Sequence, residues 1–129
     1  MEQRDGHFIY RKGAVSALKG PVVIPGSRGS LTYLVLPAAD TSLPGHSLSH
    51  GAGRKWARSL CKSRIRNKYE RDTIRQSKLG GRTVCHDTEL LYQEAPEAYK
   101  NIEHVIAALV EHGLCKVIAT LSPLVTYKG

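Results

Sequence analysis

A single histidine stands before three small residues and two cations in the stretch SHGAGRK, residues 49–55. Imidazole is largely neutral at pH 7, so its free nitrogen can attack phosphorus without prior deprotonation. Gly51, Ala52 and Gly53 carry little or no side chain, so a phosphate can approach their backbone N–H groups and be held in an anion nest. His50 is therefore the first candidate for a reacting group, and the alternative is a polar residue at a turn.

Two further features fit phosphate chemistry. Arg54 and Arg58 are spaced one helical turn apart, so their guanidinium groups can clamp nonbridging phosphate oxygens. A second glycine-rich stretch, PGSRGS at residues 25–30, lies between two expected strands. It lacks the Lys-Ser/Thr of a P-loop, and GAG is one glycine short of GxGxxG. Spacing alone therefore leaves each stretch open as a phosphate loop or a plain turn.

The sequence gives little support for a metal site. His46 precedes His50 by four residues, but Gly45 and Gly51 disfavour the helix that would bring both rings to one ion. The three cysteines form no CxxC pair, which indicates reduced thiols rather than a disulfide framework or a zinc ribbon. A small metal-binding protein is a third, weaker hypothesis, and its ligands would include Cys85, His86 and Cys115.

Composition points to one soluble domain or domain fragment covering residues 1–129, with 41% hydrophobic and 23% charged residues. Eleven of the 19 Lys and Arg lie between Arg54 and Arg82, against two acids, within a net charge of +8. Such a block attracts polyanions, nucleic acid above all, and the alternative is a solvated basic face. No apolar run approaches the ~20 residues that cross a bilayer, and the start lacks a secretory signal. We therefore expect a cytoplasmic protein without membrane contact.

The expected elements that position these residues form an α+β fold with a mixed or antiparallel sheet and two to three helices. HFIYRKG, GPVVIPG and SLTYLVLP indicate strands, and residues 37–53 indicate a loop. The basic block predicts one or two helices, and the stretch 82–96 predicts a strand followed by a loop. An apolar stripe predicts a helix from residue 102 to 110, capped by Asn101 and stopped by Gly113. A terminal strand follows, interrupted at Pro123.

Five motifs occur in a fixed order: RKGAVSA (11–17), IPGSRGS (24–30), SHGAGR (49–54), EAPEAYKN (94–101) and YKG (127–129). In this order they resemble the carboxy-terminal part of the RtcB family of GTP-dependent RNA ligases, from about Tyr10 to Gly129. The combination is far more specific than any motif alone. Its particular form is similar to the branch associated with the release factor H homologue.

The resemblance implies a reaction. Family members join an RNA 2′,3′-cyclic phosphate or 3′-phosphate end to a 5′-hydroxyl in tRNA splicing and RNA repair, using GTP and manganese. His50 matches the family histidine that attacks the α-phosphate of GTP, expels pyrophosphate and carries GMP. The GMP then moves to the RNA 3′-phosphate and leaves when the 5′-hydroxyl attacks.

The resemblance also implies binding residues. Tyr99 matches an aromatic at the guanosine pocket, and Lys128 matches the penultimate lysine that contacts guanine. Arg28 stands where the family often has Met, and Thr32 replaces a usual serine. The implied nucleotide-binding set is Pro25, Gly26, Ser27, Arg28, Thr32, Gly51, Ala52, Gly53, Tyr99 and Lys128. The residues expected at RNA or phosphate are Lys12, Arg54 and Arg58.

In the family, the manganese ligands are a cysteine and several histidines upstream of the matched segment, so we expect manganese only together with a missing amino-terminal region. The first hypothesis is an RNA-ligase module that needs a separate upstream half, and the second is a catalytically inert basic RNA-binding fragment. A chain cut from a larger fold is expected to expose apolar surface and to self-associate.

Overall fold

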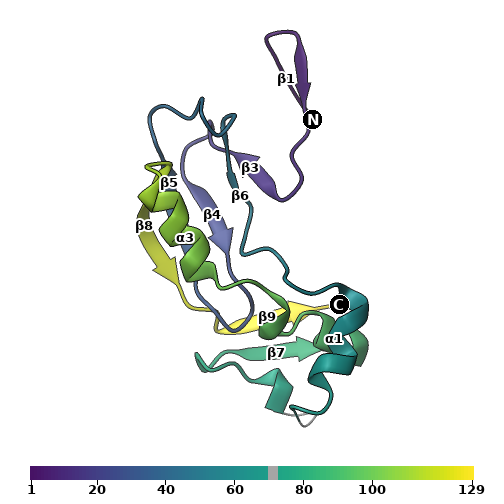
Figure 1. The fold of residues 1–129 in the computed structure, drawn as a ribbon. Coiled ribbons are helices and arrows are strands. Elements are labelled where there is room, and N and C mark those ends of the chain that lie inside the picture. The colour runs from purple at the N-terminus through teal and green to yellow at the C-terminus, as the bar shows by residue number, and fades with distance from the viewer. Residues whose placement is uncertain (70–72) are drawn as a thin grey trace.

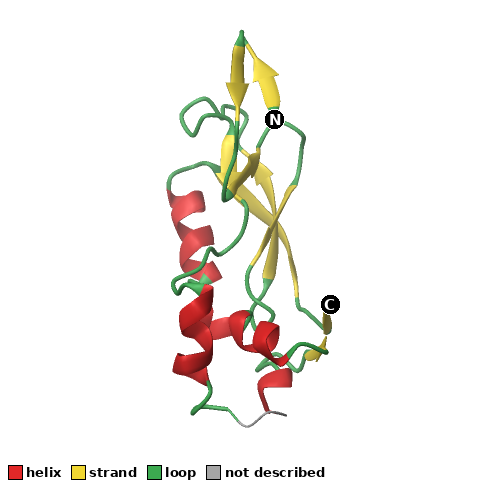
Figure 2. Cartoon of the chain, turned by 90° about the vertical axis from the view of Figure 1, so that its right-hand side faces the viewer, coloured by secondary structure: helices red, strands yellow, loops and turns green. Residues whose placement is uncertain are grey.

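The computed structural model describes residues 1–69 and 73–129. Glu70, Arg71 and Asp72 of the basic block lie outside the described residues. The described chain is elongated, with helices to one side of the strands, and its amino-terminal hairpin projects at one end (Figure 2). It contains three α-helices, several antiparallel strand pairs and one parallel pair, so the predicted α+β class is confirmed. Among the described residues, no helix has the length and apolar character to span a membrane.

The elements follow one another along the chain as Figure 1 shows. The strands are β1 (Glu2–Arg4), β2 (His7–Ile9), β3 (Ala14–Ser16), β4 (Val22–Pro25), β5 (Thr32–Pro37), β6 (Ser47–Ser49), β7 (Arg82–Cys85), β8 (Cys115–Leu121) and β9 (Val125–Lys128). The α-helices are α1 (Arg58–Ile65), α2 (Thr88–Gln93) and α3 (Ile102–Glu111), and two short 3-10 turns are η1 (Thr73–Arg75) and η2 (Pro96–Ala98).

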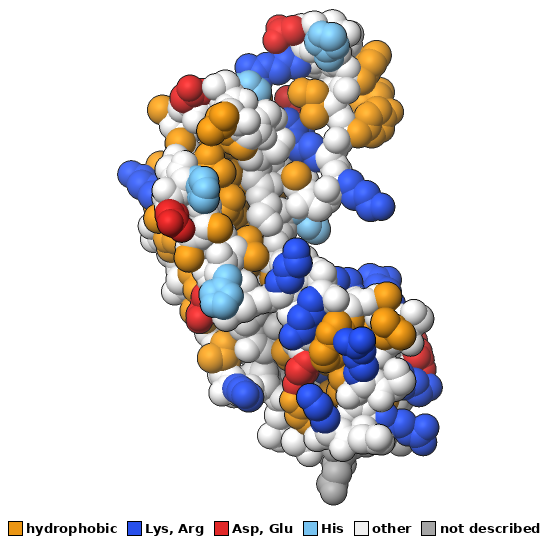
Figure 3. Space-filling model, in the orientation of Figure 1, with side chains coloured by type: hydrophobic (Ala, Val, Ile, Leu, Met, Phe, Trp, Pro, Cys, Tyr) orange, Lys and Arg blue, Asp and Glu red, His pale blue; other side chains and the backbone are white. Residues whose placement is uncertain are grey.

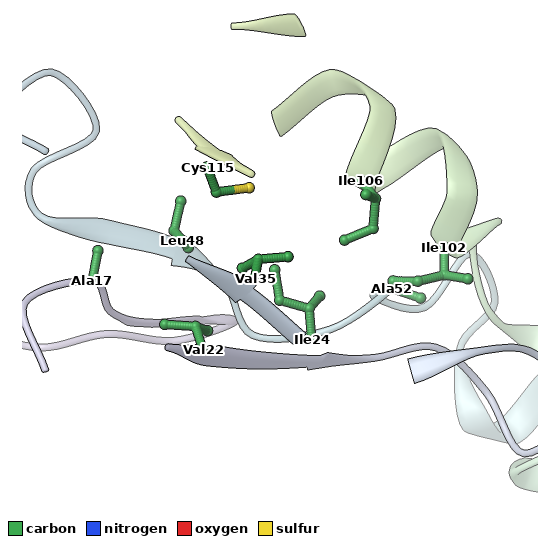
Figure 4. Packing of buried hydrophobic residues seen from close by; sticks show 9 residues of the cluster. All are labelled: Ala17, Val22, Ile24, Val35, Leu48, Ala52, Ile102, Ile106 and Cys115. Carbon is green, nitrogen blue, oxygen red and sulfur yellow. The ribbon is translucent and has the colours of Figure 1, made fainter. Parts of the chain in front are cut away.

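One half of the molecule is the antiparallel sheet β4-β5-β8 with α3 against one face (Figure 1). Alternation along β4 buries Val22 and Ile24 and exposes Val23, as expected for a strand with one covered face. The buried side chains meet Ile102 and Ile106 of α3 (Figure 4). We call this cluster the sheet core: Ala17, Val22, Ile24, Val35, Leu48, Ala52, Ile102, Ile106 and Cys115.

The other half is built by α1, α2 and the parallel pair β7-β9. We call its buried cluster the helix core: Cys61, Ile65, Ile74, Cys85, Leu91, Tyr92, Ala95 and Ala98. The loop expected after β7 is wrong in part, because residues 88–93 form α2. Asp87 caps this helix by accepting from the N–H groups of Glu89 and Leu90, and Leu91 packs into the helix core.

The stretch 37–53, expected to be a loop throughout, contains the three-residue strand β6. It pairs antiparallel with β3, with Ala14 opposite Ser49. Three residues are too few to show an alternating pattern in a sequence, so β6 could be identified only from its pairing with β3. As a result, the segment around Lys12 runs beside His50, whose backbone N–H donates to the carbonyl of Gly13 at 3.2 Å.

The cap of α3 gives a direct test of this fold. The Asn101 side chain accepts from the Glu103 N–H at 2.8 Å, and Gly113 ends the helix with a positive φ of 67°. Asn101→Ala removes the acceptor and is expected to lower the free energy of unfolding by about 1 kcal/mol, measured by urea denaturation. Asn101→Asp keeps a side-chain acceptor at the cap and is the control. Equal loss in both variants would contradict the capping role.

Candidate functional site

Three motif loops meet between the two halves. The loop 49–55 is hydrogen-bonded to both others: the Ala52 N–H donates to the Pro25 carbonyl at 3.0 Å, and the Lys100 N–H donates to the Gly53 carbonyl at 2.9 Å. The Lys55 N–H donates to the Ala98 carbonyl, also at 2.9 Å. PGSRGS and EAPEAYKN therefore lie on either side of SHGAGRK.

Two glycines are required by this close packing. A Cβ at Gly29 would lie 2.7 Å from Cγ of Pro96, and a Cβ at Gly51 would lie 3.0 Å from the Pro25 carbonyl oxygen. Neither distance is tolerated without movement of a neighbouring loop. The glycine-rich sequences thus have a packing role here, whatever they bind.

His50 presents an exposed ring beside these loops. Among the described residues, its imidazole has no hydrogen-bond partner. The Ala52 N–H is occupied by Pro25, and the Ala52 methyl group is buried in the sheet core (Figure 4). The N–H groups of Gly51 and Gly53 have no acceptor within the described part of the chain. A phosphate beside His50 would therefore meet two backbone donors from these residues rather than three.

Arg54 points into the protein. Its guanidinium carries five N–H donors, and each has an acceptor within the chain. These acceptors are the Trp56 carbonyl, the Glu94 carboxylate, the Tyr99 hydroxyl, the Cys61 sulfur and the Gln93 carbonyl. The guanidinium also lies over the Tyr99 ring, 4.9 Å from its centroid. In this structure Arg54 fastens α1 and the end of α2 to the motif loops.

Glu94 is the centre of the cation cluster. Its carboxylate, only 11% exposed, lies 3.3 Å from Arg54, 3.7 Å from Arg58 and 3.9 Å from the Lys128 ammonium. The Tyr99 hydroxyl donates to Oε2, the oxygen that also faces Lys128, whereas both arginines face Oε1. No sequence pattern indicated a role for Glu94, although it is the first residue of EAPEAYKN. Only its position among cations that are distant in sequence could have identified it.

The end of the chain reaches this cluster through a parallel strand pair. In the β7-β9 register Cys85 lies opposite Lys128. β7 begins directly after Gly81, and a Cβ at Gly81 would stand 2.3 Å from the carbonyl oxygen of Pro123, which precedes β9. The turn at Pro123, which interrupts the terminal strand as expected, thus delivers Lys128 to the carboxylate of Glu94.

Arg28 also turns inward. Its guanidinium donates to the Leu91 carbonyl at 3.2 Å, which fastens the PGSRGS loop to α2. Burial lowers the pKa of Arg28, and nearby Glu97 opposes this effect. Thr32 starts β5 opposite Pro25, so it follows the same loop into the sheet.

A cavity of about 600 Å³ adjoins the loops. Ser27, Gly29 and Tyr99 form part of its wall, together with Lys55 and Lys100. Of the predicted nucleotide-binding residues, Ser27 and Tyr99 line this space and Lys128 does not, and the predicted catalytic residue His50 does not line it either. The predicted set is thus divided between the cavity, the exposed ring of His50 and the cation cluster at Glu94.

Cations surround the site. Figure 3 shows Lys and Arg side chains gathered on the lower half of the molecule, beside a hollow between the two halves. Arg58 on α1 is 65% exposed. Lys12 is exposed next to the segment that pairs with His50. Within residues 1–69 and 73–129, no three His, Cys, Asp or Glu side chains gather to hold a metal ion.

The profile of the family described as "tRNA-splicing ligase RtcB" matches residues 1–129. The chain belongs to the RtcB family. It is 46% identical over 122 residues to the RNA-splicing ligase RtcB2 of Escherichia coli strain ATCC 25922, covering 95% of this chain and 32% of that protein. It is 37% identical over 131 residues to the RNA-splicing ligase RtcB of E. coli K12, covering 99% of this chain and 30% of that protein.

An archaeal relative gives the same picture. The tRNA-splicing ligase RtcB of Nanoarchaeum equitans is 34% identical over 138 residues, covering 95% of this chain and 28% of that protein. The chain therefore spans about a third or less of the length of these RtcB relatives. The recognition of the RtcB family from five short motifs is confirmed.

Tyr99 provides a test of the cluster around Glu94. Burial and then the hydrogen bond to Glu94 raise the pKa of the Tyr99 phenol from 10 to about 12. Because this pKa is raised on folding, the stabilisation from the protonated phenol is complete below pH 10 and is lost as the pH rises towards 12. Phenolate absorbance should show a late step that is absent from Tyr99→Phe.

Two variants control this titration. Glu94→Gln removes the neighbouring negative charge and should lower the pKa of Tyr99, while the contribution of burial remains. Tyr127→Phe, at an exposed position, should leave the late step in place. A late step that survives in Tyr99→Phe would show that Tyr99 is not in the environment described.

Proposed function

We propose that this RtcB-family chain is the nucleotide-binding, nucleophile-bearing part of a GTP-dependent RNA ligase. The reaction joins an RNA 2′,3′-cyclic phosphate or 3′-phosphate end to a 5′-hydroxyl end, in tRNA splicing or RNA repair. The observation that carries the proposal is the meeting of three motif loops around an exposed imidazole, with Tyr99 and Lys128 brought to one carboxylate. We propose that residues 1–129 act as one unit.

GTP supplies the guanylyl group and pyrophosphate as the leaving group. In the proposed step, a ring nitrogen of His50 attacks the α-phosphorus, an N–P bond forms, and the bond to the pyrophosphate oxygen breaks. The other ring nitrogen then loses its N–H proton to solvent, which leaves GMP on a neutral His50 ring. The GMP then passes to the RNA 3′-phosphate and departs when the 5′-hydroxyl attacks.

The chain's own residues have distinct proposed tasks. Gly51 and Gly53 offer their free N–H groups to the phosphates, and the loop 25–30 lies next to them. Tyr99 and Lys128 recognise the guanosine, with Glu94 orienting Lys128. Arg54 is a positioning residue, because its five donors already have partners in the chain.

Arg58 and Lys12 are the proposed contacts to RNA phosphates. Both side chains are exposed, and among residues 1–69 and 73–129 the ion-pair partner of Arg58 is Glu94, at 3.7 Å. The described residues do not gather a ligand set that fits manganese, so no step is assigned to a metal here. We propose that an upstream region of an RtcB polypeptide supplies that site. The inert RNA-binding fragment is the competing hypothesis, and the labelling experiment below separates the two.

His50→Ala is expected to abolish covalent labelling of the chain by GTP carrying a radioactive α-phosphate. The assay is run with manganese, with and without the upstream two thirds of an RtcB relative supplied as a separate polypeptide. Label on His50 should be acid-labile and base-stable, because a phosphoramidate bond has that stability. His104→Ala, an exposed histidine on α3, is the matched control and should be labelled like the wild type.

Absence of label in the wild type, with the upstream polypeptide present and folded, would contradict the ligase proposal and favour the inert fragment. Label that persists in His50→Ala would show that a residue other than His50 is the nucleophile.

An uncovered sheet face supports the proposal of an upstream partner. On the face of the sheet away from the sheet core, Ala119 and Leu121 of β8 are both exposed, and Leu121 is apolar and 52% exposed. Val23 on β4 adds a side chain that points away from the sheet core and is 54% exposed. Figure 2 shows the helices on one side of the strands only. We propose that the upstream region of an RtcB polypeptide covers this face.

The isolated chain is therefore expected to self-associate through this face. Sedimentation equilibrium should show dimers or larger species for the wild type and a shift towards monomer for Leu121→Asp. Val110→Asp, at an exposed apolar position on α3, is the control and should associate like the wild type. A wild type that stays monomeric at all concentrations would contradict the expectation.

A further inference from the structure

The only tryptophan of the chain lies between two cations. The Lys55 ammonium is 5.0 Å from the centroid of the Trp56 indole, and the Arg64 guanidinium carbon is also 5.0 Å away. Both distances fall in the range of cation–π attraction, and tryptophan is its strongest aromatic partner. The indole therefore holds two positive charges from different elements, the loop 49–55 and α1.

The position of the indole is fixed by the functional site. The backbone N–H of Trp56 donates to the Ala98 carbonyl at 3.4 Å, and the backbone carbonyl of Trp56 accepts from Nε of Arg54 at 3.3 Å. One part of the ring packs against the helix core. Trp56 is thus anchored to EAPEAYKN and to Arg54, and the two cations share that anchor.

These cations are available to an anion. Among the described residues, neither Lys55 nor Arg64 forms an ion pair, whereas Lys62 on the same helix is paired with Glu89. Both side chains are exposed. Lys55 also lines the cavity beside the loop 25–30, together with Ser27 and Lys100. A polyanion bound to Lys55 and Arg64 would therefore also lie next to the cavity.

We propose that Lys55 and Arg64, held on Trp56, bind successive phosphates of the single-stranded RNA next to the end being joined. Long flexible cations lose side-chain entropy when they bind a phosphate, and a cation already held against an aromatic ring loses less. Exposed cations around an aromatic ring suit a flexible single strand, whose phosphates can adapt to their spacing. This inference rests on the proposed ligase function and adds a specific RNA contact to it.

The test measures binding of a fluorescent single-stranded RNA 12-mer to the full chain by anisotropy over a range of salt concentrations. Lys55→Gln and Arg64→Gln should each reduce the slope of log K against log salt by about 0.7, the value for one phosphate contact on a single strand. Lys116→Gln, an exposed lysine on β8, is the control and should leave the slope unchanged.

Variants of Trp56 test the aromatic anchor separately. Trp56→Leu should weaken binding about threefold to tenfold, and Trp56→Phe, which keeps a ring, should lose much less. With an unlabelled 12-mer, the emission of the wild type reports on Trp56 alone, so RNA should change it. Urea denaturation of each variant shows whether it is folded. If Trp56→Leu is not folded, the Phe, Gln and wild-type measurements decide the question.

Unchanged slopes in Lys55→Gln and Arg64→Gln, or unchanged tryptophan emission with saturating RNA, would overturn the inference. So would equal binding of a duplex with the same sequence. Guanylyl labelling of His50 is read independently. If His50 is labelled but the salt slopes are unchanged, the proposed RNA contact is wrong and the proposed ligase function stands. If the slopes are reduced but His50 is not labelled, the RNA contact stands and the ligase function is wrong.

Discussion

The half-buried ion pair of Arg54 and Glu94, with Tyr99 bonded to both, is the interaction on which the site depends. Arg54 reaches the end of α2 and the first turn of α1, and Glu94 gathers Arg58 and Lys128. Removing Glu94 would leave three cations without their shared acid, and removing Arg54 would leave its acceptors on α1 and at the end of α2 without a donor. The positions of the motif residues therefore depend on the contacts of Arg54 and Glu94.

The charge distribution suits a site for anions even though a carboxylate is at its centre. One negative charge faces three cations within 4.0 Å, so the surroundings of Glu94 keep a positive excess. The carboxylate orients side chains that would otherwise repel one another. Further cations on α1 and in the loop 49–55 extend this field outwards along the hollow between the halves (Figure 3).

Local patterns in the sequence were enough for some elements and for the family. The apolar stripe and the asparagine cap of α3 are encoded within about ten neighbouring residues, and the alternation of β4 and β5 is equally local. The helix α2 was missed because TELLYQ is only six residues long, and β6 because a three-residue strand exists only through its partner. The order of five motifs identified the family, since no single motif had that specificity.

The geometry of the site was less predictable, because it depends on contacts between distant segments. Spacing placed Arg54 and Arg58 on one side of a helix, but Arg54 precedes α1 and its donors turn inward to residues some 40 positions away. Glu94 carried no signal that distinguishes it from a solvent-exposed acid. The structure places His50 on the surface beside small residues, and its role as the nucleophile stays a prediction.

Tyr99 belongs to the boundary of both hydrophobic clusters, packing against the sheet core on one side and the helix core on the other. Loosening either half would therefore expose part of the same ring and weaken the other half as well. We therefore expect the two halves to unfold together, in a single cooperative transition under heat or denaturant. A nucleotide bound at Tyr99 would then stabilise both halves of the molecule, from the sheet to the final strand.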